Sequence, residues 1–321
     1  MTVRRWCLRQ LRRAVGTQPL LDMLARQNGW SEFSGRSCGH AAEGASPLET
    51  AAIAEMEKFH QRLVDPRVDD QALGFRRDQA PCLIDMNGDL LWIPGDLLRF
   101  LWHTRVAGQP ALLPHFLAET PHYLWIRERL LPGDTVLDCG ANLGLFSTMM
   151  ARRVGPQGRV HAFEPSPGSS RDLARVLVLN GLFEQVAVNV AAVSDTCGEA
   201  AFCDITAGDV RREASHLDAL GRIGFLGELS HQEVRVPTVT LDAYIQREGL
   251  APRLVKIDVE GAEFLVLEGA RRSVAAHHPL LVIEIHPDEQ GHFDHGKLEA
   301  YLKQYGYRHR WQDKTYYCEP R

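Results

Sequence analysis

The stretch from about residue 132 to residue 308 alternates short apolar runs with longer segments of helical periodicity, and this alternation limits the possible folds more than any other feature of the chain. Apolar runs of this length are typical of buried strands. Strands that alternate with helices form an open, mostly parallel sheet with helices on both faces. We therefore predict an α/β fold. The predicted strands are Thr135–Cys139, Arg159–Glu164, Val186–Val193, Leu254–Asp258 and Leu280–His286. One predicted helix follows the first strand and runs to about Val154, and the others are Ser169–Asn180, Ala262–Ala276 and Lys297–Tyr305.

Both flanks of this core carry further signals. Cys82–Ile93 is predicted as a β-hairpin, because an Asn-Gly pair at 87–88 lies between two apolar runs and suits a tight turn. The aromatic and apolar positions of Leu112–Leu131 predict a helix. At the other end, Tyr307–Trp311 and Thr315–Cys318 are predicted to form a closing antiparallel hairpin.

The first 80 residues are predicted to be an N-terminal extension of a domain that spans residues 81–321, with its core at about 132–308. Residues 28–47 are rich in Gly, Ser and Ala and resemble a linker, and Pro47–Leu63 has the spacing of an amphipathic helix. The chain begins with five arginines before its first acidic residue. We interpret this start as a solvated basic helix, with peripheral contact to an anionic membrane surface as the alternative.

Charge and cysteine content exclude several classes of protein. The formal net charge is −5 at pH 7, which argues against a surface that binds nucleic acid. The seven cysteines are scattered, and no two are spaced as C-x-x-C, so we expect neither a disulfide framework nor a structural zinc site. No apolar stretch approaches the ~20 residues that span a bilayer as a helix. We therefore expect a cytoplasmic protein with reduced thiols and no transmembrane segment, whose oligomeric state the sequence leaves unknown.

The turn after the first predicted strand is the main candidate for ligand binding. Ligands of open α/β sheets bind outside the carboxyl ends of the strands. Gly140 and Gly144 lack side chains where the strand turns into a helix, so a ligand could approach the backbone closely. Asp138 would place a carboxylate near a ligand's amino group. Glu164, 26 residues later at the end of the second strand, could accept hydrogen bonds from both hydroxyls of a ribose.

A nicotinamide dinucleotide is the alternative ligand for this turn. Its fingerprint is G-x-G-x-x-G directly after the strand, with glycines that let the backbone approach a pyrophosphate. In this chain Asn142 replaces the second glycine of that fingerprint, and Leu145 replaces the third. A nucleoside without a pyrophosphate does not need those glycines, so the turn favours such a nucleoside.

A second group of polar residues follows the fourth and fifth predicted strands. Lys256, Asp258 and Glu260 alternate along an extended segment, so their side chains are expected to share one face, and Glu284 and His286 do the same on the next strand. If the two strands are neighbours, all five converge at the carboxyl end of the sheet. A buried network of ion pairs that fixes the strand ends is the structural alternative. Four further histidines, His216, His231, His292 and His295, lack convincing spacing for metal ligands, so no metal site is predicted.

The sequence resembles the FkbM family of class I methyltransferases. Four stretches carry this resemblance, in the same order as in the family, and together they span about residues 110–308. They are Pro132-Gly133-Asp134-Thr135 running into Val136–Ser147; Ala162-Phe163-Glu164-Pro165; Val239-Thr240-Leu241-Asp242; and Lys256-Ile257-Asp258-Val259-Glu260-Gly261-Ala262-Glu263, which is followed by Ile283-Glu284-Ile285-His286-Pro287.

The resemblance implies a Rossmann-like fold, S-adenosylmethionine as methyl donor, and O-methylation of a hydroxyl group. Acceptors in the family are typically sugars, glycolipids or polyketide-type secondary metabolites, so the expected partner is a small molecule, a glycan or a glycolipid. A non-catalytic module that binds the donor and a nucleotide-dependent oxidoreductase are the alternatives. The residues implied in donor binding are Asp138, Gly140, Asn142, Gly144 and Glu164.

The acceptor side is assigned by position and chemistry. We hypothesise that Asp258 orients the acceptor and that His286 takes its proton, because an ordinary imidazole titrates near neutral pH. Glu260 is the third candidate catalytic residue, and Lys256 and Glu284 complete the network. The long segment 202–237 is expected to be a lid or an acceptor-binding insertion.

Overall fold

The computed structural model describes residues 82–86, 89–94, 97, 114–205, 216–217, 231–288 and 291–321. The predicted basic start, linker and helix at Pro47–Leu63 lie outside the described residues. The chain divides into two compact units. Of the described residues, the first unit holds those up to Phe116 together with Ala174–Leu182, and the second holds the rest.

The first unit contains the predicted hairpin. Strands β1 (Cys82–Met86) and β2 (Asp89–Ile93) pair antiparallel, and the pairing of Met86 with Asp89 leaves a two-residue connection. Asn180, at the end of α7 (Pro167–Asn180), binds the backbone of this hairpin. Its Oδ1 accepts from the N–H of Trp92 at 2.9 Å, and its Nδ2 donates to the carbonyl of Trp92 at 2.7 Å. One side chain thus pairs with the strand backbone as a neighbouring strand would.

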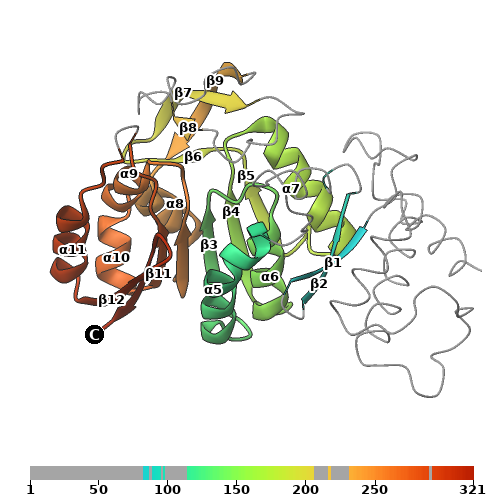
Figure 1. Ribbon diagram of the computed structural model, residues 1–321, viewed down its shortest axis with the longest axis horizontal. Coiled ribbons are helices and arrows are strands. Elements are labelled where there is room, and N and C mark those ends of the chain that lie inside the picture. The colour runs from blue at the N-terminus through green and yellow to red at the C-terminus, as the bar shows by residue number, and fades with distance from the viewer. Residues whose placement is uncertain are drawn as a thin grey trace, which may run out of the picture. The chain divides into compact units, whose positions relative to one another are not determined.

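The second unit is built on a seven-stranded sheet in the order β12-β13-β11-β10-β3-β4-β5 (Figure 1). The five strands from β11 to β5 are parallel, and β13 is antiparallel to β11. The predicted Rossmann-like α/β sheet and closing hairpin are therefore confirmed. The strands are β3 (Thr135–Cys139), β4 (Arg159–Phe163), β5 (Val186–Asn189), β10 (Leu254–Ile257), β11 (Leu280–Glu284), β12 (Tyr307–Gln312) and β13 (Thr315–Pro320).

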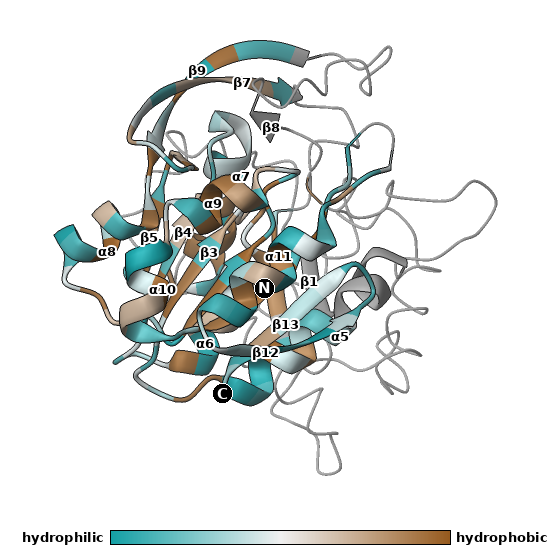
Figure 2. Cartoon of the chain, turned by 90° about the vertical axis from the view of Figure 1, so that its left-hand side faces the viewer, coloured by the Kyte–Doolittle hydropathy of each residue, from teal (hydrophilic) through white to brown (hydrophobic). Residues whose placement is uncertain are grey.

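Helices cover both faces of this sheet. Figure 1 shows α5 and α6 on one side and α8, α10 and α11 on the other. The central strands are almost fully buried, and Figure 2 shows the hydrophobic residues concentrated on them. Burial of apolar side chains from both sides stabilises the sheet. The helices are α5 (Pro114–Arg129), α6 (Leu145–Val154), α8 (Leu241–Glu248), α9 (Glu263–Glu268), α10 (Arg271–His277) and α11 (His295–Gln304).

The single helix predicted over Ala262–Ala276 is wrong, because the structure divides it into α9 and α10. The break lies at Gly269 and Ala270. A Cβ at Gly269 would overlap the backbone carbonyl oxygen of Ser194, so the chain approaches its neighbour more closely there than a continuous helix with side chains allows.

A second, four-stranded sheet was not predicted. It has the order β6-β9-β7-β8, from β6 (Ala192–Val193), β7 (Gly198–Ile205), β8 (His216–Leu217) and β9 (His231–Val239). The predicted third strand therefore ends at Asn189, and its last residues pair with β9 instead. The described residues of the segment taken as one insertion belong to this sheet, in which β7 and β9 pair antiparallel from Gly198 with Thr238 to Ile205 with His231. The described part of the chain holds no helix long and apolar enough to cross a membrane.

Candidate active site

The predicted site residues lie at the carboxyl ends of four neighbouring parallel strands. Strand β10 lies between β3 and β11, and β4 follows β3. Asp138 pairs with Lys256 in register, and the N–H of Asp258 donates to the carbonyl of Cys139 at 3.0 Å. The residues after β10 are thus tied directly to the strand that leads into the glycine turn. Because β10 and β11 are neighbours, the expected convergence of Lys256, Asp258, Glu260, Glu284 and His286 at the carboxyl end of the sheet is confirmed.

The turn after β3 depends on three residues with left-handed backbone conformations. Gly140 has φ +81°, Asn142 has φ +47° and Gly144 has φ +79°. A Cβ at Gly140 would overlap the backbone carbonyl oxygen of Asp258, and a Cβ at Gly144 would overlap the side chain of Leu173. Both glycines are therefore required by packing within the protein. The expectation that they let a ligand approach the backbone stays a prediction.

Glu164 organises the same turn from the end of β4. Its Oε2 accepts from the N–H of Asn142 at 2.8 Å, and its Oε1 accepts from the N–H of Ser166 at 2.9 Å. Each carboxylate oxygen can accept about two hydrogen bonds. These two bonds therefore use one acceptor position on each oxygen. The predicted ribose contact of Glu164 stays a prediction, and the structure adds a role in shaping the turn.

Two buried oxygen atoms in this region accept no hydrogen bond from any residue that the structure describes: Asn142 Oδ1 and Asp138 Oδ1. A buried acceptor without a donor costs about 1–3 kcal/mol. Asn142 lies in the turn itself, and a ligand with amino or hydroxyl hydrogens would satisfy its oxygen. The turn therefore fits a polar nucleoside ligand.

Asp138 is completely buried. Its Oδ2 accepts from the hydroxyl of Ser147 at 2.6 Å, and its Oδ1 lies 3.9 Å from Lys256 Nζ. Burial raises the pKa of Asp138, although the charge of Lys256 and the hydrogen bond from Ser147 oppose that shift. These contacts indicate that Asp138 fixes the start of α6 and the position of Lys256. Its predicted contact with a ligand amino group stays a prediction.

Lys256 connects the two halves of the site. Its side chain is only 5% exposed, and Nζ lies 2.7 Å from Asp258 Oδ2 and 4.9 Å from the centre of the Phe146 ring. One buried cation therefore stands between the acid of β3 and the acid that follows β10.

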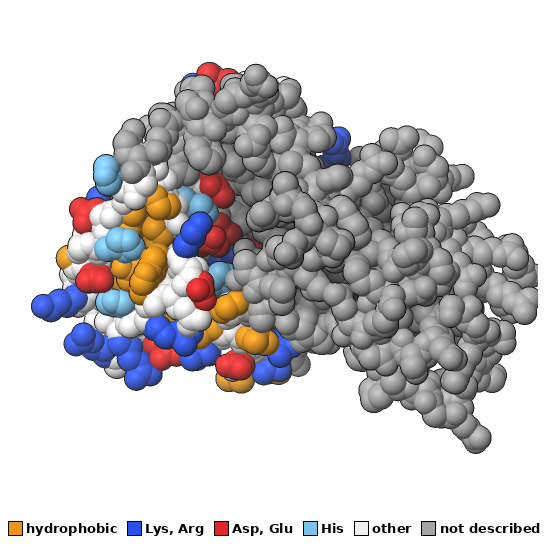
Figure 3. Space-filling model, in the orientation of Figure 1, with side chains coloured by type: hydrophobic (Ala, Val, Ile, Leu, Met, Phe, Trp, Pro, Cys, Tyr) orange, Lys and Arg blue, Asp and Glu red, His pale blue; other side chains and the backbone are white. Residues whose placement is uncertain are grey.

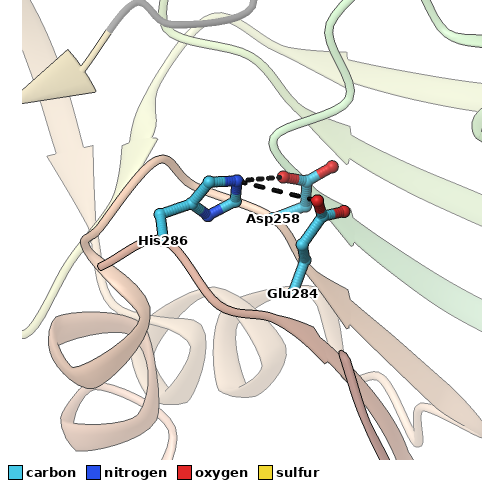
Figure 4. Close-up of side chains that lie close together, drawn as sticks. All are labelled: Asp258, Glu284 and His286. Atoms are coloured by element: carbon cyan, nitrogen blue, oxygen red, sulfur yellow. Dashed lines mark ion pairs between the residues drawn. The ribbon is translucent and has the colours of Figure 1, made fainter. Parts of the chain in front are cut away.

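His286 is surrounded by four carboxylates (Figure 4 draws two of them). Its Nδ1 is 2.8 Å from Glu263 Oε1. Its Nε2 lies 3.3 Å from Glu260 Oε1, 3.7 Å from Asp258 Oδ1 and 3.8 Å from Glu284 Oε1. Asp258, Glu284 and His286 each offer a ligand atom, and these atoms lie within 4.8 Å of one another.

This arrangement changes the expected chemistry of the histidine. Burial alone would lower the pKa of His286, but the hydrogen bond to Glu263 and the charges of Glu260 and Asp258 outweigh burial and raise the pKa to about 10. For Asp258, burial is opposed by the charges of Lys256 and His286, and the net effect lowers its pKa. The hypothesis that His286 is a proton acceptor assumed a pKa near neutrality. With a pKa of about 10, the imidazole would carry a proton at pH 7.

The backbone after Asp258 holds the carboxylates in place. Glu260 has φ +52°, which is uncommon for a residue with a side chain and costs about 1–3 kcal/mol. The N–H of the next residue, Gly261, donates to Glu263 Oε1 at 2.9 Å. The same carboxylate oxygen therefore anchors both the turn and His286.

Three residues of this region were not singled out from the sequence. Glu263 was quoted only as part of a motif, and Ser147 carried no separate signal. His122, in α5, is buried, with Nδ1 2.6 Å from the hydroxyl of Tyr317. Burial, followed by the charge of Lys256, lowers the pKa of His122 to about 4, so this imidazole is neutral.

Another histidine belongs to an aromatic cluster rather than to the site. His295 contacts the rings of Phe293, Trp311 and Tyr316, and its Nδ1 is 2.8 Å from the hydroxyl of Tyr316. The face shown in Figure 3 has hydrophobic and histidine side chains side by side, with basic side chains along one edge. Packing within this aromatic cluster accounts for the position of His295.

Comparisons with known proteins agree with this geometry. A family model for the methyltransferase FkbM domain matches residues 138–309. The chain is 30% identical over 223 residues to 31-O-demethyl-FK506 methyltransferase FkbM of Streptomyces tacrolimicus, and the match covers 63% of this chain and 83% of that protein. It is also 30% identical over 154 residues to methyltransferase sdnD of Sordaria araneosa, with 42% of this chain and 59% of that protein covered.

Among solved structures, the chain is similar to the crystal structure of methyltransferase FkbM from Methylobacillus flagellatus KT. The TM-score is 0.39 at 18% identity, and the match covers 69% of this chain. This match spans 56% of the Methylobacillus flagellatus structure. The match to the Sordaria araneosa protein spans 59% of that protein.

Proposed function

Because the chain belongs to the FkbM family of methyltransferases, we propose that it transfers the methyl group of S-adenosylmethionine to a hydroxyl group of a sugar, a glycolipid or a secondary metabolite. The Streptomyces tacrolimicus relative is named a 31-O-demethyl-FK506 methyltransferase, which supports a hydroxyl as the acceptor group. The acceptor is proposed as a small molecule or a glycan, without nucleic acid.

The observation that carries this proposal is the direct link between the glycine turn and the acidic cluster. The N–H of Asp258 binds the carbonyl of Cys139, and Gly140 packs against the carbonyl of Asp258. A donor held at the turn would therefore present its methyl group next to the carboxylates that follow β10. Methyl transfer needs this proximity, since alignment of two reactants can supply ~7–11 kcal/mol of the barrier reduction.

On the donor side, bound S-adenosylmethionine supplies a methyl group on a positively charged sulfur. Glu164 is proposed to bind its ribose hydroxyls, and the orphaned Oδ1 of Asn142 is proposed to accept from one of its N–H or O–H groups. Gly140 and Gly144 allow the chain path that places these two side chains. Asp138 accepts a hydrogen bond from Ser147 and lies beside Lys256, and is proposed to stabilise the turn through these two residues.

On the acceptor side, Asp258 is proposed to accept a hydrogen bond from the hydroxyl group and orient its oxygen toward the methyl group. The hydroxyl loses its proton as the new C–O bond forms and the C–S bond breaks. A cationic His286 cannot take that proton, so a carboxylate of the cluster, Asp258 or Glu260, is the proposed first proton acceptor. Lys256 keeps Asp258 in place, and Glu284 and Glu263 keep His286 in place.

A label-transfer screen tests the proposal. The purified protein is incubated with S-adenosylmethionine labelled at the methyl group and with extracted glycolipids and small metabolites. Label is expected in an acceptor, as an alkali-stable methyl ether. Asp258→Asn should remove the label, and Asp288→Asn, which changes an exposed acid on a later loop, should not. Donor binding without transfer to any fraction would favour the non-catalytic module, and label on nitrogen would refute O-methylation.

A further inference from the structure

We propose that Asp258, Glu284 and His286 form a binding site for one divalent metal ion, of the kind that accepts both oxygen and nitrogen ligands, such as Mn²⁺. The existence of the site is independent of the proposed function. Its catalytic role, given below, rests on that function.

The positions of the three ligand atoms support this assignment. His286 Nε2 is 3.7 Å from Asp258 Oδ1 and 3.8 Å from Glu284 Oε1, and all three atoms lie within 4.8 Å of one another. Around an octahedral ion with bonds of about 2.1 Å, neighbouring ligand atoms lie about 3.0 Å apart and opposite ones about 4.2 Å. The three atoms are therefore spaced so that one ion can touch all of them after small side-chain adjustments.

The imidazole is fixed with its Nε2 toward the carboxylates (Figure 4). Its Nδ1 is paired with Glu263, whose side chain is only 2% exposed and is held by the N–H of Gly261. A histidine that binds a metal with one nitrogen commonly donates its other N–H to a carboxylate, which fixes the ring and makes it a stronger ligand. The Glu263–His286 pair has this arrangement, so the cluster is more than a group of acids that happen to be close.

The negative charge around His286 Nε2 also favours binding of a cation. Asp258, Glu260, Glu263 and Glu284 bring four carboxylates to one imidazole, and Lys256 neutralises Asp258 from the other side. Like charges at this spacing repel one another, and burial strengthens the repulsion. A divalent ion at Nε2 would take the place of a proton there and offset more of this negative charge.

The donor set indicates which ions fit. Carboxylates suit Mg²⁺, Ca²⁺ and Mn²⁺, whereas imidazole suits softer ions of the transition series. Two carboxylate oxygens with one imidazole nitrogen are ligands that Mn²⁺ accepts, and positions not filled by the protein would be filled by water or by oxygen atoms of the acceptor. The absence of a cysteine ligand argues against a structural zinc site.

If the proposed methyl transfer is correct, the ion gives the site a way to handle the hydroxyl proton. A hydroxyl oxygen bound to a divalent ion is more acidic than the free hydroxyl. Its proton passes to the carboxylate of Glu260, the oxygen forms a bond to the methyl carbon, and the carbon–sulfur bond breaks to release S-adenosylhomocysteine. The acceptor would then be a compound that can place a hydroxyl oxygen, and preferably a second oxygen beside it, on the ion.

Mn²⁺ binding to the full chain tests the inference directly. After dialysis against a chelator, the protein is titrated with MnCl₂, and free Mn²⁺ is followed by its electron paramagnetic resonance signal. The wild type should remove one equivalent of Mn²⁺ from solution. Glu284→Gln and His286→Gln should each lose this binding, and Glu263→Gln, which leaves the ligands but removes the carboxylate behind the imidazole, should weaken it about 10–100-fold.

Asp288→Asn is the matched control. Asp288 pairs with His292 at 3.7 Å on the surface, with side chains 51% and 79% exposed, so it tests whether any aspartate near a histidine binds the ion. Its Mn²⁺ affinity should equal that of the wild type. Circular dichroism and thermal melts check that each variant is folded. If Glu284→Gln or His286→Gln does not fold, Glu263→Gln and Glu284→Asp decide the question. Glu263→Gln keeps the shape of the cluster, and Glu284→Asp keeps its charge.

The inference is overturned if the folded wild type binds no Mn²⁺ at millimolar concentration, or if binding is unchanged in the cluster variants. Calorimetry with S-adenosylmethionine on the same samples keeps the two claims apart. Donor binding without Mn²⁺ binding would remove the metal and leave the proposed function. Mn²⁺ binding without donor binding would keep the metal site and refute the proposed function.

Discussion

Replacing Lys256 with methionine is expected to destabilise the protein strongly, because it removes the cation between the buried Asp138 and the half-buried Asp258. Lys256 Nζ lies 2.7 Å from Asp258 Oδ2 and 3.9 Å from Asp138 Oδ1, and the lysine side chain is 5% exposed. At an effective dielectric constant of about 20 these two attractions are worth roughly 6 and 4 kcal/mol before desolvation is subtracted. Removing one partner of a buried pair costs about 3–5 kcal/mol after that subtraction. We expect a loss in this range for Lys256→Met at pH 7.

The assay is urea denaturation followed by circular dichroism. Lys303→Met, an exposed lysine in α11, is the control and should change the free energy of unfolding by no more than about 0.5 kcal/mol. Adding Asp138→Asn to Lys256→Met should recover part of the loss, because the amide carries no charge that needs the missing lysine.

The loss should also depend on pH. Burial already raises the pKa of Asp138, and Lys256 opposes that shift, so the pKa rises further in Lys256→Met. A carboxyl with a raised folded-state pKa binds protons better in the folded than in the unfolded protein, so stability falls as pH rises from the unfolded value of about 3.9 toward the folded value. The penalty of Lys256→Met should therefore be smallest near pH 4 and grow toward pH 7. A penalty below about 1 kcal/mol at pH 7, or one that shrinks as pH rises, would refute this reasoning.

Two further predictions follow from packing. Gly140→Ala should lower the free energy of unfolding by more than about 1 kcal/mol even without ligand, because the new Cβ meets the carbonyl of Asp258 at a positive φ; a urea midpoint equal to that of the wild type would contradict this. Iodoacetamide should modify the exposed Cys197 quickly and leave Cys139 and Cys318 unmodified in the native protein, since burial raises the pKa of both thiols. Mass spectrometry of the labelled peptides checks this, and rapid labelling of Cys139 would show that the sheet opens.

The parallel core could be predicted from the sequence because each of its strands is a short, mostly apolar run. Thr135–Cys139 is confirmed to the residue, and Leu254–Ile257 differs from its predicted end by one position. Buried parallel strands are apolar on both faces, so they stand out without any knowledge of their neighbours. The convergence of Lys256, Asp258 and His286 then followed from strand order alone.

The second sheet shows what the pattern did not reveal. In β9, Val234 and Val236 alternate with Glu233 and Arg235, which is the signal of a half-buried strand. Its partner β7 is a Gly- and Ala-containing segment with weak strand propensity, so the pairing depends on tertiary contacts. A long interval between core strands was therefore interpreted as an insertion.

The charge state of His286 could not be predicted from its own position in the sequence. Three of the carboxylates around it, Asp258, Glu260 and Glu284, were expected nearby, but the hydrogen bond between its Nδ1 and the carboxylate of Glu263 was not. Glu263 begins α9, and two residues with positive φ, Glu260 and Gly261, lie between it and Asp258. A shift of the pKa to about 10 depends on that three-dimensional arrangement.

The central claim, that the turn after β3 and the acid after β4 hold S-adenosylmethionine, is tested most directly by calorimetry with Glu164→Ala. Glu164 is proposed to bind the donor, and it also accepts from the N–H of Asn142. Loss of charge-assisted hydrogen bonds of this kind costs about 1.5–3 kcal/mol, or roughly 10–150-fold in affinity. Glu184→Ala, which changes an exposed acid, is the control. The account predicts that the wild type binds S-adenosylmethionine but not NAD and that only Glu164→Ala weakens donor binding; unchanged affinity in Glu164→Ala, or saturable binding of NAD, would contradict it.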